Sequence, residues 1–207
     1  MQNNLYNNAM SKIFYFIILL FERAIAYFKT VAYSGIVEAK VGVKFFPSSK
    51  VINIKGGQTN IKIGKNTSIR GELLTFRHGG EIVIGDYCYV GEMTRIWSAS
   101  KISIGNRVLI AHNVNIHDNN AHPIDAQQRH EQYKKIISSG HPKEDSTLNE
   151  KSIIIEDDVW IGFNSTILKG VTIGKGSIIA ACTLITKDVP PFVIIAGNPA
   201  QIIKTLK

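Results

Sequence analysis

The histidines of this chain are the first candidates for chemistry. His78 and His112 come first, and His117, His122, His130 and His141 follow within one polar stretch between residues 117 and 151. An imidazole titrates near neutral pH, so it can accept a proton from a hydroxyl or an amine. Its neutral form also binds zinc, and His78, His117 and His122 could supply three ligands. The histidines alone leave general-base and metal chemistry open.

A six-residue period predicts the scaffold that must position these histidines. Neither the helical period of 3.6 nor strand alternation maintains such spacing over thirty residues. A six-residue unit suits a short strand and a sharp corner, with an aliphatic side chain pointing into a narrow prism and three units closing one coil. We therefore expect an all-β solenoid whose coils hydrogen-bond to one another. The aliphatic positions are Ile63 and Ile69; Ile84, Val90 and Ile96; Ile104, Ile110 and Ile116; and Ile155, Ile161, Ile167, Ile173, Ile179 and Ile185.

The residues between these aliphatic positions fit the same geometry. Gly, Asn and Asp, which tolerate bent backbone, follow them at 64–66, 85–86, 105–106, 156–158 and 174–176. Cys88 and Cys182 lie in apolar patterns without a disulfide framework, so we interpret both as buried or half-buried packing residues. Small or compact residues that should point inward are Thr67, Cys88, Val108, Val159, Ser165, Val171, Ser177 and Thr183.

Interruptions of the period divide the chain into segments. Residues 1–33 form an N-terminal helical segment, 34–197 the β-helix and 198–207 a C-terminal tail. A short irregular loop is expected near 78–80, and a long extruded loop at 117–151 should carry the catalytic residues because a repeat-free segment of that length is often functional. We expect Pro190 and Pro191 to stop further strand addition.

The N-terminal segment predicts a helix over residues 10–33 that is apolar on most faces. The unbroken apolar run from 13 to 21 falls short of the roughly 20 residues that cross a bilayer. Glu22, Arg23 and the aromatic Tyr27 and Phe28 argue against a cleaved signal peptide. We favour packing against the same domain or a sister subunit. The alternative is peripheral contact with the inner membrane surface.

The charge balance limits the classes of partner that the chain is expected to bind. Twenty-four Lys and Arg against sixteen Asp and Glu give a formal charge of +8. These basic residues are mostly scattered singly, without the aromatic interleaving of a nucleic-acid surface, so we expect no nucleic-acid partner. A polyanionic small ligand fits better. Because two cysteines make no framework, we expect the reducing cytoplasm, including the inner face of the membrane.

The C-terminal repeats carry a family resemblance. The stretch IEDDVWIGFNSTILKGVTIGKGSIIAACTLITKDVPPFVIIAGNPAQIIK resembles the signature of left-handed β-helix hexapeptide-repeat acetyltransferases, which include maltose, galactoside and glycan or capsule O-acetyltransferases. The resemblance covers roughly residues 60–205 in repeat character. It implies a left-handed parallel β-helix, whereas general connection rules favour a right-handed path. It also implies a homotrimer whose sites form between subunits.

The same resemblance assigns roles to particular residues. A loop histidine followed by proline is the general base of the family, and His122 and Pro123 match it. Acetyl-CoA is the implied co-substrate, and no metal is expected. Backbone amides at Gly162-Phe163 would stabilise the oxyanion. Cofactor-binding positions are Gly162, Phe163, Ala180, Ala181, Thr186, Lys187 and Lys204.

The acceptor side of the site is less defined. Asp118 and Asn119 could orient His122 or an acceptor, or make the turn. Arg129 could bind an anionic acceptor or fix the loop through a carboxylate, and Trp160 could pack or recognise the acceptor. The family asparagine that binds small sugars is replaced by Met93. HPIDAQQR is closer to the polysaccharide and capsule enzymes than to the small-sugar enzymes.

These observations predict an acetyl-CoA-dependent O-acetyltransferase that acts on a sugar hydroxyl in surface polysaccharide biosynthesis or modification. The alternative transferase is an N-acetyltransferase of a nucleotide-linked amino sugar. Two other classes use the same scaffold: a γ-type carbonic anhydrase with zinc on His78, His117 and His122, and a non-catalytic β-helix. Metal content and acetyl-CoA binding distinguish these classes.

Overall fold

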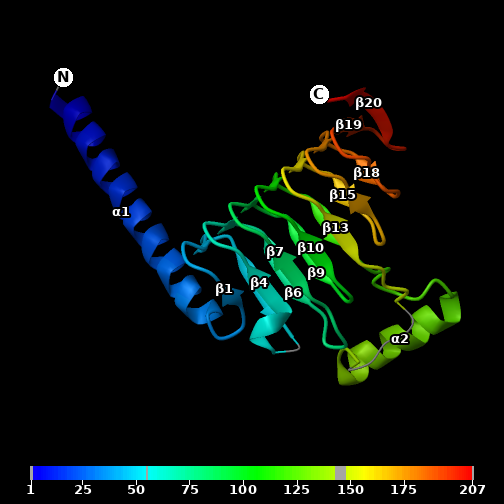
Figure 1. Cartoon of the computed structure of the whole chain (residues 1–207). Helices are drawn as coiled ribbons and strands as arrows, with labels where there is room; N and C mark the ends of the chain where they lie inside the picture. The colour runs from blue at the N-terminus through cyan, green and yellow to red at the C-terminus, as the bar shows by residue number, and fades with distance from the viewer. Residues whose placement is uncertain (1, 55, 143–147, 207) are drawn as a thin grey trace.

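The six-residue repeat forms a parallel β-solenoid with three faces (Figure 1). The computed structural model describes residues 2–54, 56–142 and 148–206, so 143–147 of the expected loop lie outside the described residues. Successive strands of one face come from successive coils, as the fold of an all-β solenoid requires. The predicted architecture is confirmed in these terms.

Each face of the solenoid is one sheet. Neighbouring strands pair in parallel, apart from the last pair of sheet B. Sheet A contains β1 (Glu38–Ala39), β4 (Ile61–Ile63), β7 (Ile82–Ile84), β10 (Ile102–Ile104), β13 (Ile153–Ile155) and β16 (Thr172–Ile173). Sheet B contains β2 (Lys44–Phe45), β5 (Ser68–Ile69), β8 (Tyr89–Val90), β11 (Leu109–Ile110), β14 (Trp160–Ile161), β17 (Ile178–Ile179), β19 (Val193–Ala196) and β20 (Gln201–Thr205). Sheet C contains β3 (Lys50–Asn53), β6 (Glu72–Thr75), β9 (Arg95–Ser98), β12 (Asn115–His117), β15 (Thr166–Ile167) and β18 (Leu184–Ile185).

The core is the ladder of aliphatic side chains inside the prism. Ile84, Ile104 and Ile155 stand in register on sheet A, and all are buried. Burying each of these side chains removes apolar area from water, which stabilises the fold by roughly 25 cal/mol per Å². The compact residues predicted to point inward are also buried, including Thr67, whose hydroxyl donates to the Gly85 carbonyl of the next coil.

The corners between sheets A and B are held by side chains from the next coil. The carboxylate of Asp86 accepts from the Lys65 amide at 2.8 Å, and that of Asp157 accepts from the Asn106 amide at 2.7 Å. The third residue of these corners has a positive φ, which Asn66 adopts readily but which is unusual for Arg107 at +57°. Asn and Asp side chains of the next coil hold these corners. Residues other than the predicted Gly, Asn and Asp can therefore occupy the positive-φ position, as Arg107 does.

Two features of the solenoid ends differ from the expectations. A first coil, β1 to β3, precedes the quoted repeat, where Ala39, Phe45 and Val51 keep the six-residue spacing with other residue types. Strand addition also continues past Pro190 and Pro191, contrary to our expectation. β19 joins β17 in parallel, and the expected tail forms β20, which pairs antiparallel with β19 and closes the edge. The prolines lie at the corner before β19, where their missing amides cost no ladder bond.

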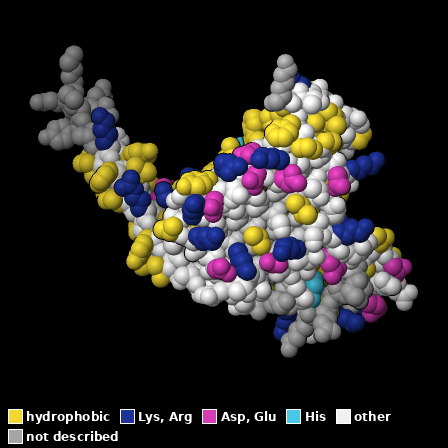
Figure 2. Space-filling view, viewed as in Figure 1, with side chains coloured by type: hydrophobic (Ala, Val, Ile, Leu, Met, Phe, Trp, Pro, Cys, Tyr) yellow, Lys and Arg dark blue, Asp and Glu magenta, His cyan; other side chains and the backbone are white. Residues whose placement is uncertain are grey.

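The N-terminal helix is longer than predicted and stands away from the solenoid. α1 (Gln2–Tyr33) contacts the first coil near its C-terminal end, where Tyr33 packs edge-on against Phe45 at 5.0 Å and the Lys29 ammonium donates to the carbonyls of Pro47 and Ser49. Figure 1 shows the rest of the helix projecting beyond the body. Large apolar side chains from Ile13 to Phe21 are exposed on it (Figure 2). None of the described helices has the length and apolar character needed to cross a membrane.

The long interruption of the repeat contains a helix that we did not predict. α2 (Ala126–Ser139) lies outside the solenoid beside its lower edge in Figure 1. The Asp125 side chain caps it by accepting from the Gln128 amide at 2.8 Å. No residue of α2 is fully buried, so the apolar periodicity that identifies most helices is weak here. The short 3-10 helix η1 (Gln58–Asn60) fills the smaller insertion between β3 and β4.

Candidate active site

The loop that carries His122 begins at a buried carboxylate. Asp118, which is fully buried, accepts from the Ser98 hydroxyl at 2.6 Å, from the Ala99 and Ser100 amides at 2.8 and 2.9 Å, and from the Asn119 amide group at 3.0 Å. Four donors satisfy a buried carboxylate without a cation. The structure therefore gives Asp118 a positioning role at the base of the loop, because its oxygens face the protein interior.

Backbone contacts close the loop on itself. The Lys151 amide donates to the Asp118 carbonyl at 2.8 Å, and the Asn120 amide donates to the Leu148 carbonyl at 3.1 Å. The Asn119 side chain accepts from the Ala121 amide at 2.7 Å, and Ala121 has a positive φ of 62°. Asn119 thus forms the turn that leads into the His-Pro dipeptide.

His122 is exposed, and its ring is held from one side. The Nδ1 atom lies 2.8 Å from the Oε1 atom of Gln132 on α2. Pro123, the next residue, is buried and anchors the backbone. The Arg129 guanidinium donates to the carbonyls of Pro123 and Ile124 at 3.1 and 2.9 Å. Arg129 therefore fixes the loop through carbonyls, where we expected either a carboxylate partner or an anionic acceptor.

The corner between β14 and β15 brings together four of the predicted cofactor residues. Gly162 lies directly against the next coil, because a Cβ atom there would be 2.6 Å from the amide nitrogen of Ala181 and 2.9 Å from the carbonyl carbon of Ala180. Its own amide donates to the Ile179 carbonyl at 2.8 Å. Among the described residues, the Phe163 amide has no such backbone partner, so Phe163 is the better candidate oxyanion donor at this corner.

Aromatic side chains stand on the outside of this region. Phe163 stacks on His112 with ring centroids 5.3 Å apart and an interplanar angle of 2°. His112 is exposed at the corner. Trp160 is half-exposed on the outer face of sheet B, in register with Leu109 and Ile178. An apolar row on a flat outer face is suited to contact with a ligand or a second chain.

The remaining cofactor candidates lie at the C-terminal end. Thr186 and Lys187 line a groove of about 350 Å³ between the β18 corner and the tail, together with Pro199 and Gln201. Lys204 is exposed on β20, paired with Ile194, and does not line this groove. The described structure therefore joins Lys187 with Thr186 but not with Lys204.

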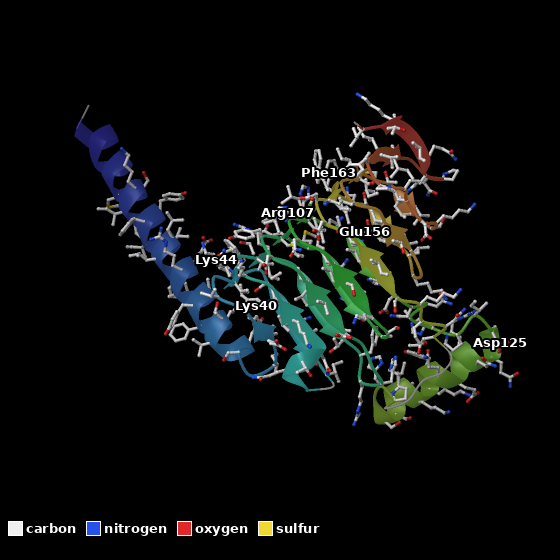
Figure 3. The ribbon with its side chains drawn as sticks, viewed as in Figure 1. Lys40, Lys44, Arg107, Asp125, Glu156 and Phe163 are labelled. Carbon is white, nitrogen blue, oxygen red and sulfur yellow. The ribbon has the colours of Figure 1, made fainter. Side chains whose placement is uncertain are left out.

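The histidine loop and the Phe163 corner lie at different edges of the prism. The loop leaves the corner between sheets C and A, whereas Phe163 sits between sheets B and C. In Figure 3, Asp125, three residues after His122, and Phe163 are at opposite edges of the solenoid. A single site that uses both therefore requires two chains.

The histidines proposed as zinc ligands do not form a ligand set. His117 stacks on Trp97 at 4.9 Å, and burial lowers the pKa of His117 below its ordinary value. His78 packs near Phe76, with ring centroids 5.5 Å apart. Across the described ranges, no three His, Cys, Asp or Glu side chains are grouped as metal ligands.

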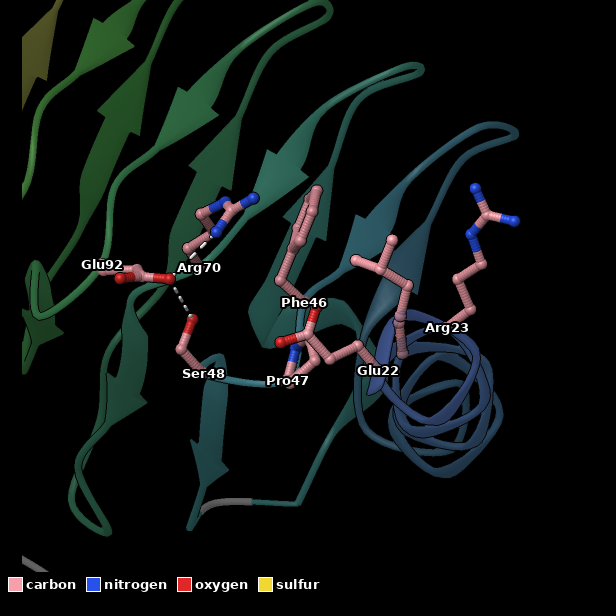
Figure 4. Close-up of a pocket in the computed structure, with 9 residues that line it drawn as sticks. Glu22, Arg23, Phe46, Pro47, Ser48, Arg70 and Glu92 are labelled. Atoms are coloured by element: carbon pink, nitrogen blue, oxygen red, sulfur yellow. Dashed lines mark hydrogen bonds and ion pairs between the residues drawn. The ribbon is translucent and has the colours of Figure 1, made fainter. Parts of the chain in front are cut away.

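A separate cavity lies between α1 and the first coils, away from the residues discussed so far (Figure 4). It has a volume of about 360 Å³ and is lined by Glu22, Arg23, Phe46 and Arg70, among others. Arg70 covers the Phe46 ring at 4.0 Å and pairs with Glu92 at 2.9 Å. These interactions tie neighbouring coils together beside the helix.

The sequence analysis did not identify Gln132 as a residue of the site, and its prediction for Cys182 was wrong. Gln132 was overlooked because nothing in a polar segment distinguishes one glutamine from several others. An N-cap predicted at Asp125 would have indicated a helix, with Gln132 three residues after Arg129 on it. Cys182 is exposed at the corner beside Phe163, contrary to the packing role expected for it, whereas Cys88 is buried. Cys182 occupies the left-handed corner position, whose side chain points outward.

Comparison with known proteins agrees with this fold. The family model described as bacterial transferase hexapeptide (six repeats) matches residues 152–187, which span β13 to β18. This part of the chain carries the hexapeptide repeat of bacterial transferases.

Two curated relatives illustrate the likeness. A provisionally named acetyltransferase of Saccharomyces cerevisiae, YJL218W, is 35% identical over 62% of this chain and 58% of its own. The provisionally named colanic acid biosynthesis acetyltransferase WcaF of Escherichia coli is 29% identical over 69% of this chain and 68% of its own. The chain thus spans only about 58% of the length of the first curated relatives it matches.

Two solved structures have a similar fold. The polySia specific acetyltransferase NeuO is 29% identical with a TM-score of 0.63, covering 82% of this chain and 66% of its own. AntD, an N-acyltransferase from Bacillus cereus, is 18% identical with a TM-score of 0.65, covering 86% of this chain and 88% of its own. At 18% identity, the AntD likeness concerns the fold.

Proposed function

We propose that this hexapeptide protein is an acetyl-CoA-dependent O-acetyltransferase of a sugar hydroxyl, with His122 as general base. The observation that carries the proposal is the state of His122, which is exposed, follows a structured turn and has Nδ1 engaged by Gln132. Nε2 is then the nitrogen that receives the proton. The family and its relatives named as acetyltransferases support the reaction class.

The chemistry follows from this geometry. His122 Nε2 takes the hydroxyl proton while the oxygen attacks the thioester carbonyl of acetyl-CoA. The carbonyl oxygen becomes an oxyanion, which the Phe163 amide can stabilise by donating a hydrogen bond. Collapse of the tetrahedral intermediate breaks the carbon–sulfur bond, and the imidazolium returns its proton to the departing thiolate. The products are the acetyl ester and coenzyme A, with no covalent enzyme intermediate.

The residues of the C-terminal coils fit coenzyme A. Ala180 and Ala181 leave room for a narrow pantetheine arm along the corner, and Lys187 in the groove offers positive charge to a phosphate. Lys204 can contribute charge from β20 without lining that groove. We propose that this donor half is completed by the His122 loop of a neighbouring chain.

A homotrimer and a left-handed coil belong to the same proposal. Because the prism has three corners and the two halves of the site lie at different ones, a threefold arrangement can bring the loop of each chain to the Phe163 corner of the next. Trp160 would then lie between subunits. The exposed apolar part of α1 would be covered by a sister subunit, as we favour from its sequence, with the inner membrane face as the alternative.

The acceptor is proposed as a surface polysaccharide. WcaF is named for colanic acid and NeuO for polysialic acid, both glycan contexts. Arg129 is occupied by carbonyls, so the candidate for contact with a glycan is Trp160, across the subunit boundary.

Release of coenzyme A thiol tests the reaction. The purified full chain is mixed with acetyl-CoA and bacterial polysaccharides, and we expect turnover that falls at least a hundredfold in His122→Ala. His130→Ala, which removes an exposed histidine of α2, is the matched control and should retain activity. Full turnover in His122→Ala, or no acetyl-CoA binding by calorimetry, contradicts the proposal. A product resistant to mild base would be an amide and would assign N-acetylation instead.

A further inference from the structure

Two residues of α2, Arg129 and Gln132, contact the loop that carries His122, and the N-cap residue Asp125 precedes them. Asp125 caps the helix, Arg129 binds the carbonyls of Pro123 and Ile124, and Gln132 meets the His122 ring. These positions are four and three residues apart, the spacing that places side chains on one face of a helix. The helix is therefore built against the His-Pro turn, although it buries no side chain completely.

The contact with Gln132 determines the tautomer of His122. An amide oxygen can only accept, so Nδ1 at 2.8 Å from Oε1 must carry the hydrogen. In the neutral ring, Nε2 then has the free lone pair. We propose that Gln132 is a positioning residue that holds His122 in the Nδ1–H tautomer with Nε2 available as the base. This inference rests on the proposed function.

The chemical nature of the partner has a consequence for pH. In the serine-protease arrangement a carboxylate holds the histidine and stabilises the imidazolium that forms. Gln132 provides the same orientation without a charge. A carboxylate in the place of Gln132 would add a negative charge that favours the protonated ring.

Two variants separate orientation from charge. Gln132→Met keeps the length but removes the acceptor, so kcat should fall about tenfold, the value of one hydrogen bond, while KM for acetyl-CoA stays unchanged. Gln132→Glu keeps the acceptor and adds a negative charge. It should restore kcat at alkaline pH and move the acidic limb of the kcat profile to higher pH by roughly one unit. Gln127→Met, an exposed glutamine on the same helix, is the control.

A direct measurement accompanies the kinetics. Nitrogen-15 NMR of the resting full-length protein should show His122 in the Nδ1–H form and a shift toward the Nε2–H form in Gln132→Met. Circular dichroism and thermal unfolding check that each variant keeps its fold. An unchanged kcat and an unchanged tautomer in Gln132→Met overturn the inference. If His122→Ala itself remains active, the proposed function fails, whereas an inactive His122→Ala beside a normal Gln132→Met refutes only the role of Gln132.

Discussion

The Asp118 carboxylate accepts a 2.6 Å hydrogen bond from the Ser98 hydroxyl of the preceding coil. Together with the amides of Ala99 and Ser100, this contact ties the start of the His122 loop to the solenoid. The loop therefore leaves the prism from a fixed point, even though much of it is polar and exposed.

Replacing Asp118 tests this attachment. In Asp118→Asn, the new NH2 group must replace an oxygen that accepts two hydrogen bonds, so we expect the free energy of unfolding to fall by about 1–3 kcal/mol and kcat to decrease. Chemical denaturation and steady-state kinetics measure the two effects. Ser98→Ala, the control, removes one donor of four and should cost less. Equal stability of Asp118→Asn and the wild type would contradict a structural role for the carboxylate.

Gly162→Ala tests the close approach of two coils. The added methyl would lie 2.6 Å from the Ala181 nitrogen, a backbone atom that cannot move independently. We expect a loss of stability of about 1–3 kcal/mol from overpacking and weaker binding of acetyl-CoA. Gly35→Ala is matched, because nothing lies within 4 Å of its new methyl, and it should unfold like the wild type. Thermal unfolding of both variants decides the matter.

The two cysteines report on the proposed donor site. Cys182 is exposed, whereas Cys88 is buried. Burial raises the pKa of the Cys88 thiol. A thiol reagent should therefore modify Cys182 first, and acetyl-CoA should slow that reaction because Cys182 adjoins Phe163. Mass spectrometry of the labelled peptides identifies the site. Labelling of Cys182 at the same rate with and without acetyl-CoA would place the cofactor elsewhere.

Acid should weaken the corner formed by Arg107 and Asp158. The Arg107 guanidinium donates to Asp158 at 2.6 Å and holds the pKa of that carboxyl below its ordinary value. The pKa of this carboxyl is lower in the folded chain than in the unfolded chain, where it is near 4, so the ion pair stabilises the fold at pH values above about 4. This contribution disappears as the pH falls through the folded-state pKa. Asp158→Asn should therefore show a flatter dependence of unfolding free energy on pH between about 5 and 2. Glu131→Gln, an exposed carboxylate on α2, should behave like the wild type.

The exposed side chains of α1 test assembly. We expect light scattering to give the mass of a trimer for the full chain, and the combined changes Phe14→Gln, Ile18→Gln and Phe21→Gln to lower that mass. Lys12→Gln is the control from the same helix. A variant that remains trimeric, together with sedimentation of the wild type on anionic vesicles, would assign this surface to the membrane instead.

The solenoid can be predicted from the amino-acid sequence, because the six-residue signal is local and repeated. Each six-residue unit specifies an inward aliphatic residue and a corner, as Ile155 and Asp157 do, so the pattern survives substitution at single positions. The resemblance at the C-terminal coils extended this to a hexapeptide transferase, and the family comparison agrees. His122 could be named from the His-Pro pair alone, although its role stays a proposal.

The arrangement of the candidate site could not be predicted in the same way, because it depends on contacts between distant residues. Whether Asp118 faces an acceptor or the interior depends on Ser98, twenty residues earlier in the chain but in the adjacent coil. The partner of His122 depends on α2, whose polar sequence lacks a buried face and so leaves little periodic signal. The separation of His122 from Phe163 arises because successive strands turn the chain from one face of the prism to the next. Contacts between distant residues, which no local pattern encodes, set these relationships.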